Sequence, residues 1–509
     1  MVIQDQHYLQ PDDLPKVPFV LNGISSRFIR EHLVVPLELK NDTLKVVMAN
    51  PEDRSAIDAL KVATSADIKV YTADSKALDD YITKFYGQET QNINKLIEDI
   101  GEKEIEFIRE EEEGDVGHLK DLASEAPIIK LVNLLITRAV ETRASDIHIE
   151  PFEDELKVRY RIDGVLHEVE SVPKKLQAAI VSRIKIMSKL NIAERRLPQD
   201  GRIRLKVGES EIDLRVSTVP VLHGEGVVMR ILLKEGIVID LDLLGFPPQT
   251  LSSFNQLIKK PNGIILVTGP TGSGKTTTLY GALDKINLPD KKIITVEDPI
   301  EYQLKGVNQI QVKTQIGLNF ASTLRHIVRQ DPDIIMIGEV RDLETAEIAI
   351  QSALTGHLVF STLHTNDAPS AITRLLDMGV ENFLLSSTVR GILAQRLVRA
   401  ICPLCKEVDR SLAGKEELSA LGLGSDVKQY RGRGCEHCAS TGYYGRLGIF
   451  ELLVVGEDIR TLILKNSDAN QLRESARRSG MRTLFEDGAQ KIKEGVTTLS
   501  EVLRVTQEA

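Results

Sequence analysis

Within this chain of 509 residues, one segment reads Gly269-Pro270-Thr271-Gly272-Ser273-Gly274-Lys275-Thr276. It follows the apolar run 264–267 and leads into a helix-forming segment. Backbone N–H groups can surround a phosphate chain only where the loop carries little side-chain bulk, and the glycines provide such a loop. A strand, a glycine loop ending in Lys-Thr, and a helix form the pattern of a P-loop, which binds nucleotide phosphates. A turn that only connected a strand to a helix would need neither the Lys-Thr pair nor a buried strand before it.

Each residue type of the P-loop pattern has an expected role in binding the nucleotide. We expect the Lys275 ammonium to reach the β- and γ-phosphates and the Thr276 hydroxyl to bind Mg²⁺. The positive end of the following helix would face the phosphates. The sequence therefore predicts a nucleotide site formed by Gly269, Pro270, Thr271, Gly272, Ser273, Gly274, Lys275, Thr276 and Thr277.

The overall charge of the chain argues against nucleic acid as its main partner. The sequence has 64 Lys and Arg against 74 Asp and Glu, a net charge of −10, whereas proteins that bind a phosphate backbone are basic. The first residues lack the basic and apolar regions of a signal peptide, and no apolar run approaches the ~18 residues of a membrane span. We therefore expect a soluble, cytosolic protein.

The length of the chain predicts three or four domains. The stretch from Glu98 to Asp115 carries ten acidic and two basic residues, so it repels itself and is typical of a linker. The apolar spacing over 93–108 is also compatible with a solvated helix. The expected units are an N-terminal module at 1–95, an acidic linker at 96–118, an α+β domain at 119–235, a short link at 236–248, the P-loop domain at 249–400, a cysteine subdomain at 401–445 and a helical subdomain at 446–509.

The N-terminal module carries no catalytic cluster. Strand-like runs at 44–49 and 67–71 flank a helix-like segment at 55–63. This pattern is compatible with a partner-binding module and equally with a folded unit that has no binding role.

The sequence of the second unit predicts helices and a mainly antiparallel sheet. A helix opens at Ala126-Pro127 and continues to Arg143, and an amphipathic helix is expected over 175–190. Strand-like runs lie at 146–150, 156–162, 165–169, 202–207, 211–217 and 227–232. Arginines recur along these strands, at Arg159, Arg161, Arg202, Arg204, Arg215 and Arg230. Most should face solvent, but in a ring-shaped NTPase some would reach the nucleotide of a neighbouring subunit.

The P-loop domain alternates strand and helix signals, which indicates a largely parallel sheet with helices on both faces. Strands are expected at 264–268, 293–296, 334–337 and 358–361, with helices from Gly274 and over 343–354. Glu297, Asp298 and Glu339 come directly after two of these strands, at the sheet edge where the P-loop also lies. They are candidates for holding the metal and for orienting or deprotonating the attacking water.

Two histidines and two arginines are further candidates in this domain. His357 and His364 flank one strand, and imidazole can donate, accept or carry charge near neutral pH. A lone histidine is more often structural, but two around one strand favour a role at the phosphates. Arg325 and Arg329 share a helical face through their i,i+4 spacing. A surface salt bridge and an anion-binding face both remain open for them.

All four cysteines of the chain lie in two C-x-x-C pairs separated by 29 residues: Cys402, Cys405, Cys435 and Cys438. Paired C-x-x-C motifs bring thiolates together around Zn²⁺, and four thiolates leave no open position for catalysis. We expect a structural zinc site. His437 could replace a neighbouring cysteine as a ligand, and reduced thiols without metal are the remaining alternative.

These motifs together resemble the ATPase family of the type II secretion system, the E-protein family, within the wider superfamily of type II/IV secretion and type IV pilus ATPases. The resemblance covers roughly residues 119–509. It depends on the segment 144–151, the P-loop, the acidic segment 293–301, the segment 329–342, the two histidines and the cysteine quartet. It implies an α/β fold with a RecA-like P-loop NTPase core, a preceding α+β, PAS-like domain, a small N-terminal α/β module and a zinc-binding C-terminal subdomain.

The resemblance also implies roles for individual residues. Glu297 is similar to the general base of the family and Glu339 to its Mg²⁺-linked acid, while His357 and His364 match its histidine box. The phosphate-contacting arginines would be Arg215, Arg230, Arg325 and Arg329, acting within or between subunits. The cofactors implied are ATP, Mg²⁺ and Zn²⁺.

By the same resemblance, the protein would form a homo-hexameric ring, peripheral at the cytoplasmic face of the bacterial inner membrane. ATP turnover would move one large domain against the other and drive pseudopilus assembly through inner-membrane platform proteins. The closest alternative is a type IV pilus assembly ATPase, and a retraction motor fits the cysteine quartet less well. A nucleotide-gated scaffold without turnover is disfavoured by the intact Lys275, Glu297 and Glu339, and a nucleic-acid motor by the net charge.

Overall fold

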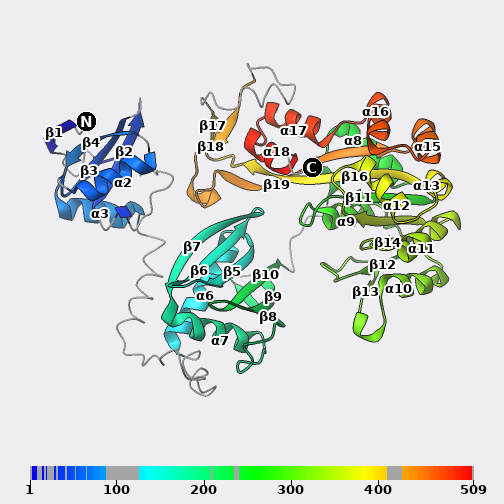
Figure 1. The fold of residues 1–509 in the computed structure, drawn as a ribbon, viewed down its shortest axis with the longest axis horizontal. Coiled ribbons are helices and arrows are strands. Elements are labelled where there is room, and N and C mark those ends of the chain that lie inside the picture. Colours follow the sequence, from blue (N-terminus) through cyan, green and yellow to red (C-terminus); the bar gives the residue numbers. More distant parts are fainter. Residues whose placement is uncertain are drawn as a thin grey trace.

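The computed structural model describes residues 3–86 apart from short gaps, 125–207, 210–233, 240–409 and 427–506. Figure 1 shows three main sheets in separate bodies along the chain. The predicted acidic linker and the helix proposed over 93–108 lie outside the described residues. Within the described part, no helix is both long enough and apolar enough to cross a bilayer.

The first body is a four-stranded sheet in the order β1-β4-β3-β2. Alternate residues of β3 face opposite sides, so Val46 packs under one helix and Val47 under the other. The strands and helices predicted from the sequence here are present. The elements are β1 (Ile3–Tyr8), β2 (Val34–Lys40), β3 (Thr43–Met48), α2 (Arg54–Thr64), β4 (Asp67–Thr72) and α3 (Ser75–Tyr86).

The second body is a six-stranded antiparallel sheet in the order β7-β6-β5-β10-β9-β8, with its helices packed on one apolar face. The strand β6 alternates strictly between buried and half-exposed residues, as a sheet with one covered face requires. The predicted α+β arrangement is confirmed. Its elements are α6 (Ala126–Glu141), β5 (Ala144–Pro151), β6 (Glu155–Ile162), β7 (Val165–Pro173), η2 (Lys174–Leu176), α7 (Gln177–Met187), β8 (Gln199–Val207), β9 (Ser210–Val221) and β10 (Gly224–Leu233).

The third body contains a seven-stranded sheet in the order β13-β12-β14-β15-β11-β16-β19. Neighbouring strands are parallel except for β16 and β19, which are antiparallel. The inner strands are buried along their whole length, which explains their continuous apolar sequences. The strands are β11 (Gly263–Thr268), β12 (Ile293–Glu297), β13 (Asn308–Gln311), β14 (Ile334–Ile337), β15 (Leu358–Leu363), β16 (Val389–Ile401) and β19 (Tyr443–Val454).

Helices cover both faces of this sheet. One face packs on the first two helices of the domain, α8 (Pro248–Leu257) and α9 (Lys275–Ile286), through residues such as Phe254 and Leu283. The other face packs on the remaining helices, including the C-terminal ones. These are α10 (Phe320–Ile327), α11 (Leu343–Leu354), α12 (Ala368–Asp377), α13 (Asn382–Thr388), α15 (Glu457–Leu464), α16 (Ala469–Arg478), α17 (Leu484–Lys493) and α18 (Leu499–Thr506). The 3-10 turn η3 (Leu241–Leu243) packs on the face of α8 and α9, while η4 (Thr314–Ile316) and η5 (Val328–Gln330) precede and follow α10.

The seven-stranded sheet crosses the predicted divisions at residues 400 and 445, because β19 starts at Tyr443 and pairs with β16. Between these two strands the chain forms a small hairpin, β17 (Lys406–Val408) with β18 (Tyr430–Gly432), and the turn η6 (Glu436–Cys438). The C-terminal helices therefore share a core with the P-loop sheet.

Glu451 of β19 joins the P-loop sheet to the C-terminal helices. Its two carboxylate oxygens accept the N–H of Ala368 at 2.8 Å and of Leu484 at 3.4 Å, at the first residues of α12 and α17. The side chain is buried, and burial raises the pKa of this carboxyl to about 7. One buried carboxylate thus satisfies two helix N-termini.

We expect Glu451→Ala to lower the free energy of unfolding by about 2 kcal/mol, because two buried N–H groups lose their acceptor. Chemical denaturation at pH 8 measures the change. Glu347→Ala is the matched control, since Glu347 is exposed on α11, and its effect should stay within about 0.5 kcal/mol. Equal effects of the two variants would contradict the assignment.

Candidate active site

The P-loop lies between β11 and α9 and is packed against β16. Gly274 has a left-handed backbone (φ +87°), and a Cβ there would lie 2.8 Å from the side-chain nitrogen of Gln395. A Cβ at Gly269 would lie 2.5 Å from the backbone oxygen of Gln395. Both positions therefore need glycine for the close approach of the loop to β16.

Lys275 lies at the opening of this loop. Its ammonium donates to the backbone oxygens of Gly269 at 2.8 Å and Pro270 at 3.0 Å. Burial lowers its pKa to about 8, although the nearby charge of Glu339 acts in the opposite direction. The buried hydroxyl of Ser273 has no hydrogen-bond partner. A phosphate chain in the loop would supply acceptors for both groups, so the residues present fit a nucleotide.

Glu339 faces the P-loop from the end of β14. Its carboxylate contacts Arg341 at 2.6 Å and the His364 Nε2 at 3.4 Å. Burial lowers the pKa of His364, and the positive charge of Lys275 adds to this effect, so the imidazole is neutral at pH 7. The structure thus brings together Lys275, Glu339 and His364, which follow the carboxyl ends of three neighbouring strands.

Glu297, the last residue of β12, lies deeper in the same region. Its side chain is 3% exposed and accepts hydrogen bonds from the Tyr280 hydroxyl, the Thr295 hydroxyl at 2.5 Å and the Gln309 amide at 3.1 Å. Buried polar groups of this kind are stable only when hydrogen-bonded. Glu297 is therefore a fixed carboxylate, whereas Glu339 contacts exposed partners.

The structure does not bring His357 to the P-loop. His357 precedes β15, and its Nδ1 lies 2.8 Å from the Ser352 oxygen and 3.1 Å from the Thr355 hydroxyl. The six residues of β15 separate it from His364, a distance of about 20 Å along a strand. The two ends of the strand are therefore not equivalent positions, because in a parallel sheet only the carboxyl ends of the strands lie beside the P-loop.

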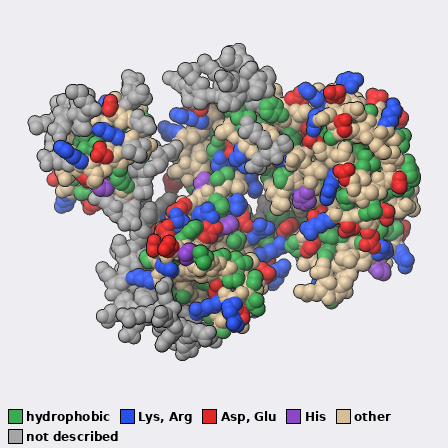
Figure 2. Space-filling view, in the orientation of Figure 1, with side chains coloured by type: hydrophobic (Ala, Val, Ile, Leu, Met, Phe, Trp, Pro, Cys, Tyr) green, Lys and Arg blue, Asp and Glu red, His purple; other side chains and the backbone are tan. Residues whose placement is uncertain are grey.

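The arginines of the second domain form a row across its sheet. The strand register places Arg202 opposite Arg215, and Arg215 opposite Arg230, so all three lie on one face. Arg215 contacts Glu301 at 3.3 Å and donates to the Ile300 oxygen at 3.3 Å, directly beyond the Glu297 segment. In Figure 2, Lys and Arg side chains gather where this domain meets the P-loop domain.

The outer members of the row have fewer partners. Arg230 pairs with Asp146 at 2.9 Å. Arg202 is exposed, and none of the described acidic residues forms an ion pair with it. The positive charge of this row of arginines is thus only partly neutralised within one chain.

Arg325 and Arg329 lie on the surface in and after α10. Arg325 pairs with Glu344 of α11, and Arg329 lies in η5, which leads to the start of β14. This start is at the sheet edge opposite the P-loop. Arg329 therefore lies away from the P-loop of its own chain, whereas Arg325 contacts the first turn of α11, which begins shortly after Glu339.

Two residues of β16 were not predicted as part of the site. Gln395 accepts a hydrogen bond from the Thr278 hydroxyl at 2.7 Å, and Arg396 donates to the Asn366 oxygen at 2.9 Å. Both side chains are buried and lie against the glycines of the P-loop. The signal in the sequence is their position as adjacent polar residues inside the otherwise apolar run 391–398.

The four cysteines converge on one point. Their sulfur atoms all lie within 4.8 Å of one another, and the pairs Cys402–Cys435 and Cys405–Cys438 are separated by 3.8 and 3.9 Å. His437 is not part of this group, since its ring stacks on Tyr444 with centroids 4.0 Å apart. Four sulfur donors at these distances fit a tetrahedral zinc ion.

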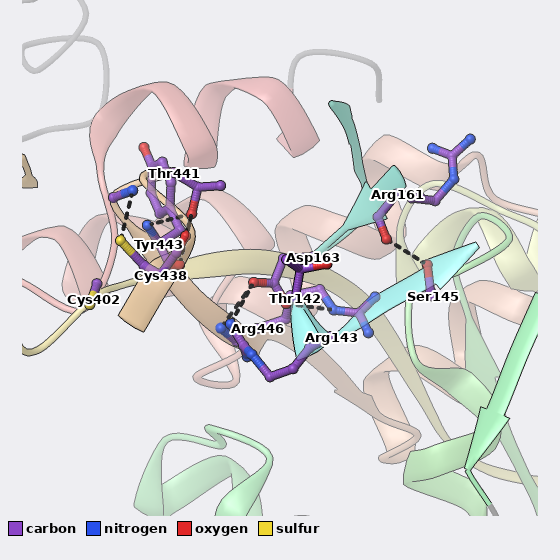
Figure 3. A network of polar contacts seen from close by, with 12 residues as sticks. Thr142, Arg143, Ser145, Arg161, Asp163, Cys402, Cys438, Thr441, Tyr443 and Arg446 are labelled. Carbon is purple, nitrogen blue, oxygen red and sulfur yellow. Dashed lines mark hydrogen bonds and ion pairs between the residues drawn. The ribbon is translucent and has the colours of Figure 1, made fainter. Parts of the chain in front are cut away.

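The segment after the cysteines contacts the second domain (Figure 3). The Arg143 guanidinium lies 3.5 Å from the centre of the Tyr444 ring. Asp163, in the turn between β6 and β7, accepts the N–H of Gly445 at 3.1 Å and lies 3.9 Å from both Arg143 and Arg446. One carboxylate therefore connects the cysteine segment with the α+β domain.

The glycine loop at the end of a central strand, with acids at the ends of neighbouring parallel strands, defines a P-loop ATPase fold. A family model described as type II/IV secretion system protein matches residues 121–504, and one described as MshEN domain matches residues 5–92. The chain belongs to the type II/IV secretion system protein family.

Relatives share nearly the whole chain. It is 53% identical over 504 residues to the type II secretion system protein E of Xanthomonas campestris pv. campestris, covering 98% of this chain and 87% of the relative. It is 45% identical over 496 residues to the type IV pilus assembly ATPase PilB of Myxococcus xanthus, covering 96% and 87%. The fold is similar to that of the ATPase DotB of Legionella pneumophila (TM-score 0.55, 21% identity), covering 75% of this chain and 96% of DotB.

We expect nucleotide affinity to weaken as the pH rises above about 8. Burial holds the pKa of Lys275 near 8 in the free protein, and bound phosphates would favour its charged form, so binding takes up a proton above that pH. The dissociation constant of a non-hydrolysable ATP analogue should rise by up to about tenfold per pH unit. Lys275→Ala should bind weakly at every pH without this slope. A wild-type constant that is flat from pH 7 to 9 would contradict the prediction.

Proposed function

We propose that the chain is the ATP-hydrolysing motor of a type II secretion system, which drives pseudopilus assembly and protein export. The observation that carries this function is the convergence of Lys275, Glu339 and His364 at the mouth of the P-loop. The 53% identity to a type II secretion system protein E over almost the whole chain supports the secretion branch.

The chemistry assigns a role to each group at the loop. Thr276 and Glu339 would hold Mg²⁺, which would supply neutralisation of charge on the phosphates. Lys275 exchanges its contacts with the Gly269 and Pro270 oxygens for phosphate oxygens. Glu297 accepts the proton of the attacking water, and neutral His364 donates toward the terminal phosphate.

The arginines support a ring of six subunits as the active form. Arg329 lies away from the P-loop of its own chain, and the row that contains Arg215 and Arg230 is only partly neutralised. Guanidinium groups bind phosphate oxygens in a bidentate manner, so these side chains can complete the site of a neighbour. Such a ring would act at the cytoplasmic face of the inner membrane through platform proteins, with the module at 5–92 as the partner-binding part.

A type IV pilus assembly ATPase is the second candidate, favoured by the 45% identity to PilB over 96% of the chain. Complementation separates the two functions. We expect the gene to restore protein export to a strain that lacks its type II secretion ATPase, and not piliation to a strain that lacks PilB.

We expect the ATPase rate per subunit to rise with protein concentration, because neighbouring subunits complete each site. Glu297→Gln should lower kcat by a factor of about 100 or more, as loss of a general base does. Arg215→Ala should remove the concentration dependence together with most of the activity. Steady-state phosphate release over a concentration series measures all three.

Arg478→Ala is the control for this series, since Arg478 is exposed on α16 and should leave the rate unchanged. A rate strictly proportional to concentration, or full activity of Glu297→Gln, would refute the inter-subunit mechanism with Glu297 as the base.

We further propose that the cysteine cluster holds one structural zinc ion. Elemental analysis of the purified chain should find about one zinc per subunit, and Cys405→Ser should lose it and lower the melting temperature. His437→Ala should keep the zinc, because its ring stacks on Tyr444 and lies outside the sulfur group. Retention of zinc by Cys405→Ser together with its loss from His437→Ala would refute this ligand set.

A further inference from the structure

The Glu297 carboxylate accepts three side-chain hydrogen bonds, from residues of α9, β12 and β13. The Tyr280 hydroxyl of α9 donates to Oε2, while the Thr295 hydroxyl at 2.5 Å and the Gln309 amide at 3.1 Å donate to Oε1. The carboxylate is 3% exposed, and Tyr280 and Thr295 are fully buried. Such a group is held in one orientation by its donors and not by solvent.

The number of acceptor positions limits what Glu297 can still bind. A carboxylate has about four lone-pair positions, two on each oxygen. Both positions of Oε1 are occupied, by Thr295 and Gln309, and one position of Oε2 is occupied by Tyr280. A single acceptor direction is therefore left, on Oε2. A general base needs one such free direction, aimed at the proton of the water.

The three donors are themselves fixed. Gln309 accepts the N–H of Leu304 at 2.7 Å and donates to the Tyr302 oxygen at 2.9 Å, which sets the orientation of its amide. Tyr280 lies one and a half turns after Lys275 on α9 and packs in the core of the sheet. Burial raises the pKa of the Tyr280 hydroxyl, and the charge of Glu297 raises it further, so the hydroxyl remains a donor.

We propose that Tyr280, Thr295 and Gln309 are positioning residues for hydrolysis. They orient the Glu297 carboxylate so that its one free acceptor direction, on Oε2, takes the proton of the attacking water. This inference rests on the proposed role of Glu297 as the general base. Because Tyr280 belongs to the helix that starts at Lys275, the phosphate-binding lysine and the base are connected through α9.

The test compares steady-state ATPase kinetics of full-length variants that each remove one hydroxyl. Tyr280→Phe and Thr295→Val should lower kcat tenfold or more, as the loss of a hydrogen bond to a charged group does, while KM for ATP stays within about twofold. Thr295→Ser retains the hydroxyl and should restore kcat to near the wild-type value. Melting temperatures, measured in parallel, identify any variant that fails to fold. If Tyr280→Phe does not fold, the comparison of Thr295→Val with Thr295→Ser decides the test.

Tyr302→Phe is the matched control. Its ring packs edge-on against Tyr280 with centroids 6.3 Å apart, but its hydroxyl is not among the donors to Glu297, so kcat should change less than twofold. Wild-type kcat in both Tyr280→Phe and Thr295→Val would overturn the inference, and so would equal losses in Thr295→Val and Thr295→Ser.

Glu297→Gln in the same assay separates this inference from the proposed function. If Glu297→Gln abolishes turnover while Tyr280→Phe and Thr295→Val turn over normally, Glu297 is the base and the three donors do not position it. If Glu297→Gln turns over normally, the base assignment fails, and the inference fails with it.

Discussion

The site depends on the pairing of β11 with β15 on one side and β16 on the other. The register places Thr268, the last residue before the P-loop, beside Leu363 and Ala394. His364 and Gln395 each follow directly, so they reach the loop at the same level. The Thr268 hydroxyl secures this arrangement by donating to the Leu363 oxygen at 3.1 Å. A slip of one residue would turn every side chain of a strand to the other face and would separate these groups.

The elements of the P-loop domain could be predicted because its strands are buried on both faces and its turns carry strong signals. The helix expected over 343–354 is found with the same bounds, and each predicted strand is present. It was harder to predict at which edge of the sheet a given residue lies. His357 and His364 look equivalent in the sequence, and only the direction of β15 within the sheet distinguishes them.

Contacts between distant segments could not be predicted from local patterns. Tyr280 and Gln309 lie 17 and 12 positions from Glu297, on a helix and on the edge strand, and neither belongs to a charged motif. The pairing of β16 with β19 connects residues about fifty positions apart, so the predicted boundaries could not take it into account. The cysteine cluster was predictable, because ligand spacing is a local property of the chain.

The second domain is held at two places on the P-loop body. Near Glu297, Arg215 contacts Glu301, and near the cysteines Asp163 contacts Gly445. Both contacts belong to one sheet with one apolar core. One packed unit thus contacts both the cysteine segment and the region beside Glu297.

The row of Arg202, Arg215 and Arg230 has a consequence for the behaviour of the domain in solution. Like charges directly opposite each other on neighbouring strands repel. Of the two acidic partners, Asp146 belongs to the same domain and Glu301 to the P-loop domain, so the isolated α+β domain keeps only the Asp146 contact. Dissolved ions screen exposed charges over roughly 8 Å at physiological ionic strength. In the isolated α+β domain, added salt accordingly weakens the repulsion along this row, whereas it weakens the attraction within surface ion pairs.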